Sequence, residues 1–222
     1  IGGQSSRPGS DAGDEREERR RVVPVIEAIH REFPEALISV DTWRASVASE
    51  AVAFGARMVN DIGAGLLDET MLPTVGRMGV PYVAMHMQGV PSTMQHAPSY
   101  TDVVAEVTLF LSERLRAAHA AGIADVILDP GIGFGKTTRH NYALLRELPR
   151  LNALGAPVLV GLSRKRMINE VLGTAPAEAL NGTTALNTLA LSSGAAILRV
   201  HDVKEAVECV KLVDAFLNVR SE

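Results

Sequence analysis

The chain has little from which a disulfide framework, a membrane anchor or a nucleic-acid surface could be built. One of its 222 residues is a cysteine, Cys209, so no intrachain disulfide can form. No apolar run approaches the roughly 20 residues of a membrane-spanning helix, and the N-terminus lacks the basic-then-apolar layout of a signal peptide. A net charge of -4 gives no basic footprint for nucleic acid. These absences predict a cytoplasmic protein that binds neither membrane nor nucleic acid, with Cys209 a buried structural thiol.

Aromatic residues are also scarce, at 4% of the chain against 46% for all hydrophobic residues. A core with this composition consists of aliphatic strands and alanine-rich helices. The length fits one large domain, and no linker, low-complexity tract or abrupt change of composition divides it. The sequence therefore predicts a single domain over residues 1–222.

Six short apolar runs each end in a polar or charged residue. They are LISVD ending at Asp41, MVND at Asp61, PYVAMH at His86, DVILD at Asp129, VLVGLSRK at Lys165 and ILRVH at His201. Continuous Val/Ile/Leu runs are typical of parallel strands whose two faces are both buried. The pattern predicts an α/β fold of the (β/α)8 TIM-barrel type, with its polar residues gathered at the carboxyl ends of the strands, where such barrels hold their active sites.

Segments with helical period lie between these runs. Buried faces are expected from Val22, Ile26, Ile29 and Phe33, from Val104, Val107, Leu111, Leu115 and Ala118, and from Val203, Val207, Val210, Val213 and Leu217. The opening Ile1-Gly2-Gly3 resembles the end of a strand already under way. An eight-stranded barrel would then lack its first strand, its first helix and most of its second strand.

Three loop motifs follow strand ends. IGGQSSRPGS, with Arg7, describes either a mobile rim loop that approaches a ligand or an ordinary loop. DPGIGFGK, from Asp129 to Lys136, has the wrong glycine spacing for a nucleotide phosphate loop, but lets the backbone and Phe134 approach a flat ligand. SRKR, from Ser163 to Arg166, either binds an anion or faces solvent.

Carboxylates at the mouth of an apolar barrel need a partner or a ligand, because an unpaired buried charge is costly. Asp41 and Asp129 would accept the paired donors of an amino-pyrimidine edge, while Lys165 or Asn60 would contact the carbonyl and ring nitrogens of the same heterocycle. Adjacent strand residues point to opposite faces, so of Asn60 and Asp61 we expect Asn60 to face the ligand. Such a site would bind a pterin or a guanine-like ring.

The last strand ends in Arg199 and His201, whose spacing of two puts both side chains on the same side. Because the last loops of such barrels often bind phosphate, this pair predicts a diphosphate site. His86 and His96 belong to no recognisable metal-ligand triad, so structural or polar roles are expected for them and no protein-held zinc site follows.

Taken in order, IGGQSSRPG, ISVDT, VND, MHMQGVPSTMQ, LDPGIGFGKT, GLSRK, LNGTTALNT and RVHDV resemble the successive motifs of the dihydropteroate synthase family over nearly the whole chain. The resemblance implies condensation of 6-hydroxymethyl-7,8-dihydropterin diphosphate with p-aminobenzoate to give 7,8-dihydropteroate and diphosphate. It also implies an SN1-like path through a pterin cation, a magnesium ion, a homodimer and inhibition by sulfonamides that mimic aminobenzoate.

The resemblance further implies roles for individual residues. Asp41, Asp129 and Lys165 would be catalytic, and the pterin would contact Asp41, Asn60, Ile62, Met85, Asp129, Phe134, Leu159, Gly161 and Lys165. Arg199 and His201 would bind the diphosphate, and p-aminobenzoate would contact Ser6, Arg7, Pro8, Phe134, Ser163 and Lys165. No metal ligand is expected within these 222 residues, because the family's Asn near the metal belongs to the segment that would precede Ile1.

The sequence differs from the family pattern in two places, and two alternative functions stay open. Without the first strand and its loop, the 222 residues alone would leave the cation incompletely covered, and Arg166 stands where many family members have Ser. One rival is another pterin-binding barrel, such as a methyltetrahydrofolate-dependent methyltransferase, which should lack the SRK and RPG motifs. The other is a homologue that binds pterin without turnover. A barrel with no ligand would leave the converging acidic and basic residues unexplained.

Overall fold

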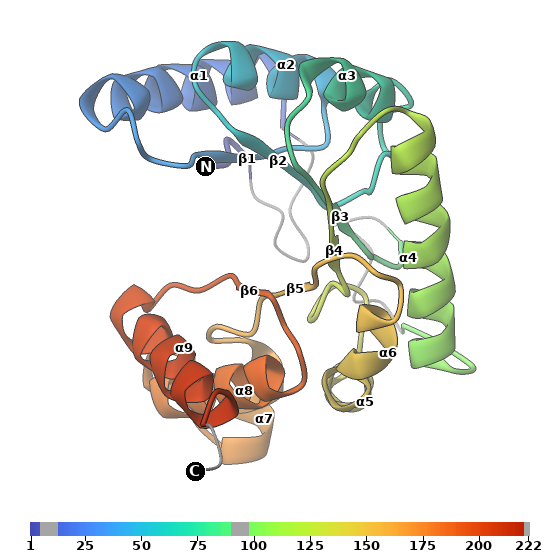
Figure 1. The fold of residues 1–222 in the computed structure, drawn as a ribbon, viewed down its shortest axis with the longest axis vertical. Helices are drawn as coiled ribbons and strands as arrows, with labels where there is room; N and C mark the ends of the chain where they lie inside the picture. Colours follow the sequence, from blue (N-terminus) through green and yellow to red (C-terminus); the bar gives the residue numbers. More distant parts are fainter. Residues whose placement is uncertain (5–12, 90–97, 220–222) are drawn as a thin grey trace.

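The computed structural model describes residues 1–4, 13–89 and 98–219. Short parallel strands form a curved sheet, with helices along its convex side (Figure 1). The strands are β1 (Ser39–Asp41), β2 (Met58–Asp61), β3 (Tyr82–Met85), β4 (Val126–Asp129), β5 (Leu159–Val160) and β6 (Ile197–Leu198). The helices are α1 (Glu15–Glu32), α2 (Ala45–Ala53), α3 (Met71–Met78), α4 (Val103–Ala120), α5 (Thr138–Arg146), α6 (Leu148–Asn152), α7 (Arg166–Leu172), α8 (Leu180–Ser192) and α9 (Val203–Leu217), with a 3-10 turn at Pro176–Glu178.

Strand order follows chain order, as expected for a barrel in which each strand returns through a helix. β1 to β4 form one ladder and β5 pairs with β6, while a parallel bridge from Leu128 to Val158 joins the two groups. Gly2 bridges to Asp41 in parallel, so the opening residues do extend the sheet beside β1. The six predicted runs are therefore the six strands described, and each ends at the edge where the predicted polar residues stand.

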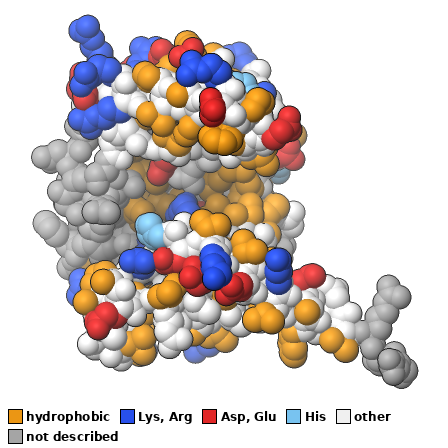
Figure 2. All heavy atoms as spheres, turned by 90° about the vertical axis from the view of Figure 1, so that its left-hand side faces the viewer, with side chains coloured by type: hydrophobic (Ala, Val, Ile, Leu, Met, Phe, Trp, Pro, Cys, Tyr) orange, Lys and Arg blue, Asp and Glu red, His pale blue; other side chains and the backbone are white. Residues whose placement is uncertain are grey.

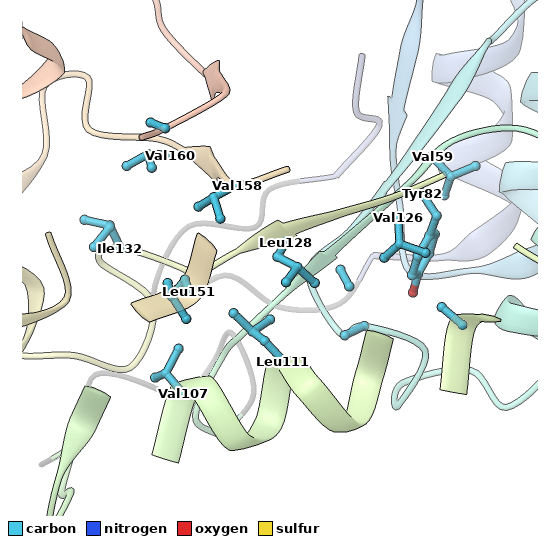
Figure 3. Packing of buried hydrophobic residues seen from close by; sticks show 14 of the residues in the cluster. Val59, Tyr82, Val107, Leu111, Val126, Leu128, Ile132, Leu151, Val158 and Val160 are labelled. Atoms are coloured by element: carbon cyan, nitrogen blue, oxygen red, sulfur yellow. The ribbon is translucent and has the colours of Figure 1, made fainter. Parts of the chain in front are cut away.

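Alternating strand residues pack on two sides of the sheet. Val59, Tyr82, Val126 and Leu128 face the helices, where Val107 and Leu111 of α4 point toward them (Figure 3). Val83, Ile127 and Leu159 form a smaller cluster on the concave side. Both faces of β3, β4 and β5 are thus buried, as the unbroken apolar runs predicted, whereas β6 is only half-buried.

The concave side contains a cavity of about 290 Å³ between the two ends of the arc. Its lining includes Met58, Val83, Leu159 and Ile197. Figure 2 shows the corresponding hollow between the part that carries α1 to α3 and the part that carries α7 to α9. None of the helices in the described residues is long and apolar enough to cross a membrane.

Predicted helical faces agree with the structure in α4 but not in α9. Asp102 caps α4 by accepting from the backbone N–H groups of Val104 and Ala105, each at 3.0 Å. In α9 the buried residues are Ala206, Cys209 and Val213. The expectation for Val203, Val207, Val210 and Leu217 was wrong, since all four are exposed, as is Phe33 just after α1. Apolar periodicity located the helix but not the face that packs on α8.

Candidate active site

A cavity of about 170 Å³ lies at the carboxyl ends of the strands. It is lined by Asp41, Asn60, Ile62, Phe134, Gly161, Ser163, Lys165, Arg199, Val200 and His201. Nine of these ten residues had been assigned to substrate binding from the sequence. Their common place follows from the parallel topology, which brings the ends of successive strands to one rim.

A chain of polar contacts crosses this cavity. The Asn60 side-chain N–H donates to Asp41 Oδ1 at 3.0 Å, and Arg199 Nη1 donates to Asn60 Oδ1 at 3.2 Å. Arg199 Nη2 lies 2.9 Å from Oδ2 of Asp129, which is fully buried. The guanidinium passes over Gly161, where even a Cβ atom would stand 3.0 Å from Nη2. Arg199 therefore serves as counter-ion to Asp129 inside the predicted pterin slot.

Asp61 points away from this chain, as expected for the neighbour of Asn60. Its buried carboxylate accepts from the backbone N–H groups of Gly63 and Gly65, both at 2.7 Å, and from the hydroxyl of Tyr82 at 2.6 Å. Burial raises the pKa of Asp61, opposed by these hydrogen bonds. The hydrogen bonds of Asp61 thus stabilise the turn after β2, and Asn60 is the residue that faces the cavity.

Lys165 is the residue just before α7, and its ammonium group reaches back to the loop after β4. Nζ donates to the carbonyl of Ile132 at 2.7 Å and lies 4.5 Å from the centre of the Phe134 ring. Desolvation, assisted by Arg199 and opposed by Asp129, lowers the pKa of Lys165 to about 8. The predicted proximity of Lys165 and Phe134 is therefore present in the structure.

The turn after β5 also contacts the turn after β6. Ser163 Oγ lies 2.9 Å from His201 Nδ1 and accepts from the His201 backbone N–H at 3.3 Å. Arg199 and His201 reach the same cavity, as their spacing predicted.

Other assigned residues lie elsewhere or outside the described ranges. Met85 is fully buried at the end of β3 and lines neither this cavity nor the concave one. Leu159 lines the concave cavity rather than the rim cavity. The aminobenzoate contacts expected of Ser6, Arg7 and Pro8, and the role expected of His96, lie outside the described residues.

The sequence did not single out Lys136, yet it is buried at the heart of the loop after β4. Its Nζ donates to the carbonyls of Gly131 at 3.0 Å and Phe134 at 2.9 Å, and to His86 Nδ1 at 2.9 Å. Burial, assisted by Lys136, lowers the pKa of His86 to about 3, so its ring is a neutral acceptor. His86 therefore has the structural role expected of it. The unusual position of Lys136, after three glycines in a loop, was the available signal.

A second cavity of about 460 Å³ adjoins the first through Lys165. It lies between the starts of α5 and α7 and includes Gly133, Thr138, Arg166 and Glu170 in its lining. Arg166 and Thr138 both bond to Glu170 at its rim. The two cavities offer adjoining spaces for two substrates, with Lys165 between them.

The described residues do not fit a dedicated magnesium site. Mg²⁺ favours carboxylate and phosphate oxygens in octahedral geometry. Here Asp129 is engaged by Arg199 and by the Gly131 N–H, and Asp41 by Asn60. No group of three or more His, Cys, Asp or Glu side chains in the described ranges could hold a metal ion. A magnesium requirement stays a prediction.

Comparison with known proteins agrees with this geometry. The family model described as pterin binding enzyme matches residues 1–201. Dihydropteroate synthase of Escherichia coli K12 is 45% identical over 222 residues, which cover 99% of this chain and 78% of the relative.

Two solved structures extend the likeness to the fold. Yersinia pestis dihydropteroate synthase in a sulfonamide drug complex superposes with a TM-score of 0.93 at 42% identity, covering 97% of this chain and 78% of the other. The Xanthomonas albilineans enzyme in complex with 7,8-dihydropteroate gives a TM-score of 0.86 at 45% identity, covering 96% and 78%. Strand order, rim cavity and sequence identity thus agree, and the chain belongs to the pterin binding enzymes as a member of the dihydropteroate synthase family.

Proposed function

We propose that the two adjoining cavities bind the two substrates of dihydropteroate synthase, a transferase that joins 6-hydroxymethyl-7,8-dihydropterin diphosphate to p-aminobenzoate. The observation that carries the proposal is the rim cavity, which places Asp41, Asn60, Lys165, Arg199 and His201 around one space. Carboxylates, amide and ammonium match the donors and acceptors of a pterin ring, while arginine and histidine match a diphosphate.

Pterin binding would release Arg199 from Asp129. The ring's N–H donors would satisfy the fully buried carboxylate in place of the guanidinium. Arg199 would then be free to bind the diphosphate beside His201. Before binding, Oδ2 of Asp129 has the ion pair with Arg199 but no hydrogen bond. Since a buried carboxylate left unpaired is costly, the exchange keeps a partner on Asp129, and the donors of the ring would add the missing hydrogen bond.

In the reaction, the bond between the pterin methylene carbon and the diphosphate oxygen breaks first, and the bonding electrons leave with diphosphate. The negative charges of Asp41 and Asp129 would stabilise the resulting pterin cation, because they are already fixed by Asn60 and by the Gly131 N–H. The amine of p-aminobenzoate then forms the new C–N bond and loses one proton. Phe134 and Ser163 line the rim where the two substrates would meet.

The aminobenzoate would occupy the second cavity, whose lining includes Gly133, Lys165 and Arg166. Magnesium would bind together with the diphosphate. Its ligands would be diphosphate oxygens, and no site formed by protein side chains would be needed. A cytoplasmic location is also proposed, because a chain whose one cysteine, Cys209, is a free buried thiol needs no oxidising compartment to fold.

A homodimer forms part of the proposal. Helix α9 has an exposed apolar stripe beside the face that packs on α8. The stripe consists of Val203, Val207, Val210 and Leu217. An apolar stripe of this kind is typical of a surface covered by a partner.

The decisive experiment incubates the full-length protein with 6-hydroxymethyl-7,8-dihydropterin diphosphate and Mg²⁺, with and without p-aminobenzoate. Dihydropteroate, detected by mass, should form only when both substrates are present. Pterin binding without product would instead identify a non-catalytic homologue. No pterin binding at all would overturn the proposal.

A further inference from the structure

Arg164 stands between two residues of the rim cavity but lines neither cavity itself. Its backbone φ of 55° lies in the left-handed region, where a residue with a side chain is disfavoured. This conformation turns Arg164 away from the space that Ser163 and Lys165 face. Such strain persists only where the surroundings hold it.

Two contacts hold this conformation. The Arg164 backbone N–H donates to Thr183 Oγ1 of α8 at 3.1 Å. The guanidinium donates to both carboxylate oxygens of Asp202, from Nη2 at 2.6 Å and from Nε at 3.1 Å. A bidentate pair of this geometry fixes orientation as well as distance.

Asp202 directly follows His201, so the ion pair connects the turn after β5 with the turn after β6. Ser163 Oγ already touches the backbone and ring of His201. Ser163 thus contacts His201, and Arg164 contacts Asp202. Lys165 follows Arg164 in the turn after β5, and Arg199 precedes His201 in the turn after β6.

We propose that Arg164 and Asp202 form a loop clasp, a positioning pair that holds the turn carrying Lys165 against the turn carrying His201. The clasp rests on the proposed function, because it fixes the spacing between the group that contacts the pterin and the group that contacts its diphosphate. Neither residue lines the two cavities proposed to bind substrate.

Asp202 has a second consequence for the anion site. Pairing with Arg164 lowers the pKa of Asp202, so the carboxylate stays ionised well below neutral pH. It also neutralises the charge of Arg164 in the turn beside the rim. The clasp therefore orders the turns without adding another anion-binding group to the rim.

The test compares Arg164→Gly, Asp202→Asn, the double variant and Arg164→Lys in the full-length protein. Glycine accepts a positive φ, and asparagine is a good residue before a helix, so the first three variants should keep the melting temperature of the wild type or exceed it. We expect kcat/KM for the pterin diphosphate to fall about tenfold or more in each, since a displacement near 1 Å can cost about 100-fold.

Three further results distinguish positioning from general weakening. The double variant should lose no more than either single variant, because both substitutions break one contact. Arg164→Lys, which keeps the charge but not the bidentate geometry, should recover part of the loss. Affinity for inorganic diphosphate with Mg²⁺, measured by calorimetry, should fall in parallel with kcat/KM.

Arg19→Ala is the matched control, because it breaks an ion pair of similar exposure with Glu50, between α1 and α2. It should leave kcat/KM and diphosphate affinity unchanged. Wild-type constants in Arg164→Gly, or fully additive losses in the double variant, would overturn the clasp while leaving the reaction intact. A wild-type protein that forms no dihydropteroate would overturn the proposed function, and the diphosphate affinities of the variants would still decide the clasp. No diphosphate binding by the wild type would overturn both.

Discussion

Lys165 occupies the junction of the two cavities and is the residue whose removal should separate binding from folding. Its ammonium group bonds to one backbone carbonyl and lies over one aromatic ring, both in the loop after β4. Lys165 as a whole residue is half-buried, and desolvation of its ammonium group lowers its pKa. Few contacts of the fold therefore depend on it, whereas the pterin would depend on it directly.

For Lys165→Ala we predict the loss of pterin binding, by about 10-fold or more, with the free energy of unfolding lowered by no more than about 1 kcal/mol. A hydrogen bond to a charged group contributes about 1.5–3 kcal/mol, which is the expected loss in binding. Calorimetry with a pterin ligand and urea unfolding give the two quantities. The exposed Lys204 provides the control variant Lys204→Ala. Normal pterin affinity in Lys165→Ala would remove Lys165 from the site.

Two lysines of the site should make stability depend on pH. Burial lowers the pKa of Lys136 to about 7 and that of Lys165 to about 8, from an ordinary 10.5. Between these values and 10.5 the unfolded chain binds more protons than the folded one. The free energy of unfolding should therefore rise with pH from about 7 to 10, by up to about 1.4 kcal/mol per pH unit for each lysine.

Urea unfolding at pH 7, 8 and 9 measures this dependence. Lys165→Ala should reduce the slope above pH 8, and Lys204→Ala should not. A free energy of unfolding that is constant or falls over this pH range would contradict the lowered pKa values of Lys136 and Lys165.

At the scale of the element, the loop from Asp129 to Lys136 is organised around the buried amino group of Lys136. Gly131 allows the close turn, since a Cβ there would lie 1.8 Å from the carbonyl oxygen of His86. Lys136 Nζ then donates hydrogen bonds to the carbonyls of Gly131 and Phe134 and to the ring of His86. The same loop supplies Asp129, the Ile132 carbonyl that holds Lys165, and the Phe134 ring.

We predict that Lys136→Met lowers the free energy of unfolding by about 1–3 kcal/mol, because it leaves buried acceptors without a donor. Loss of the buried charge offsets part of that cost. Since the loop also positions Phe134, kcat/KM should fall by about 10- to 100-fold. Urea unfolding and product formation measure the two effects, with Lys211→Met on α9 as the exposed control. Unchanged stability in Lys136→Met would show that the loop does not need the cation.

The same elements show how far the sequence could be interpreted. Strand ends such as Asp41, Asp129 and Arg199 were predictable, because a parallel sheet buried on both faces leaves unbroken apolar runs that stop at the rim. Asn60 was separated from Asp61 by strand alternation alone. Lys136 escaped notice because its partners are mostly backbone carbonyls, which any sequence supplies. The ion pair between Arg199 and Asp129 joins residues 70 positions apart, and only the curvature of the sheet brings them together.

At the scale of the whole molecule, α9 has two adjacent apolar faces. Ala206, Cys209 and Val213 pack inward, where small side chains allow α8 and α9 to approach closely. The larger residues of the neighbouring stripe remain exposed, by 47% for Val210 and 63% for Val203. Sequence periodicity cannot distinguish a face that covers a barrel from one that covers a partner, because both are apolar. The misassigned face of α9 is therefore what a homodimer would require.

For Val210→Glu we predict a change from dimer to monomer in solution, with circular dichroism unchanged because the side chain already lies outside the core. A carboxylate buried without a partner in the interface would weaken association by about 3–5 kcal/mol, or more than about 100-fold. Light scattering after size exclusion, over a range of protein concentrations, measures the mass. Leu109→Glu, at an exposed apolar position of α4, is the control and should remain dimeric. A monomeric wild type would refute the dimer itself, and a dimeric Val210→Glu would move the interface away from α9. Because the rim residues Arg199 and His201 immediately precede α9, a partner seated on this helix would also hold the diphosphate end of the site in place.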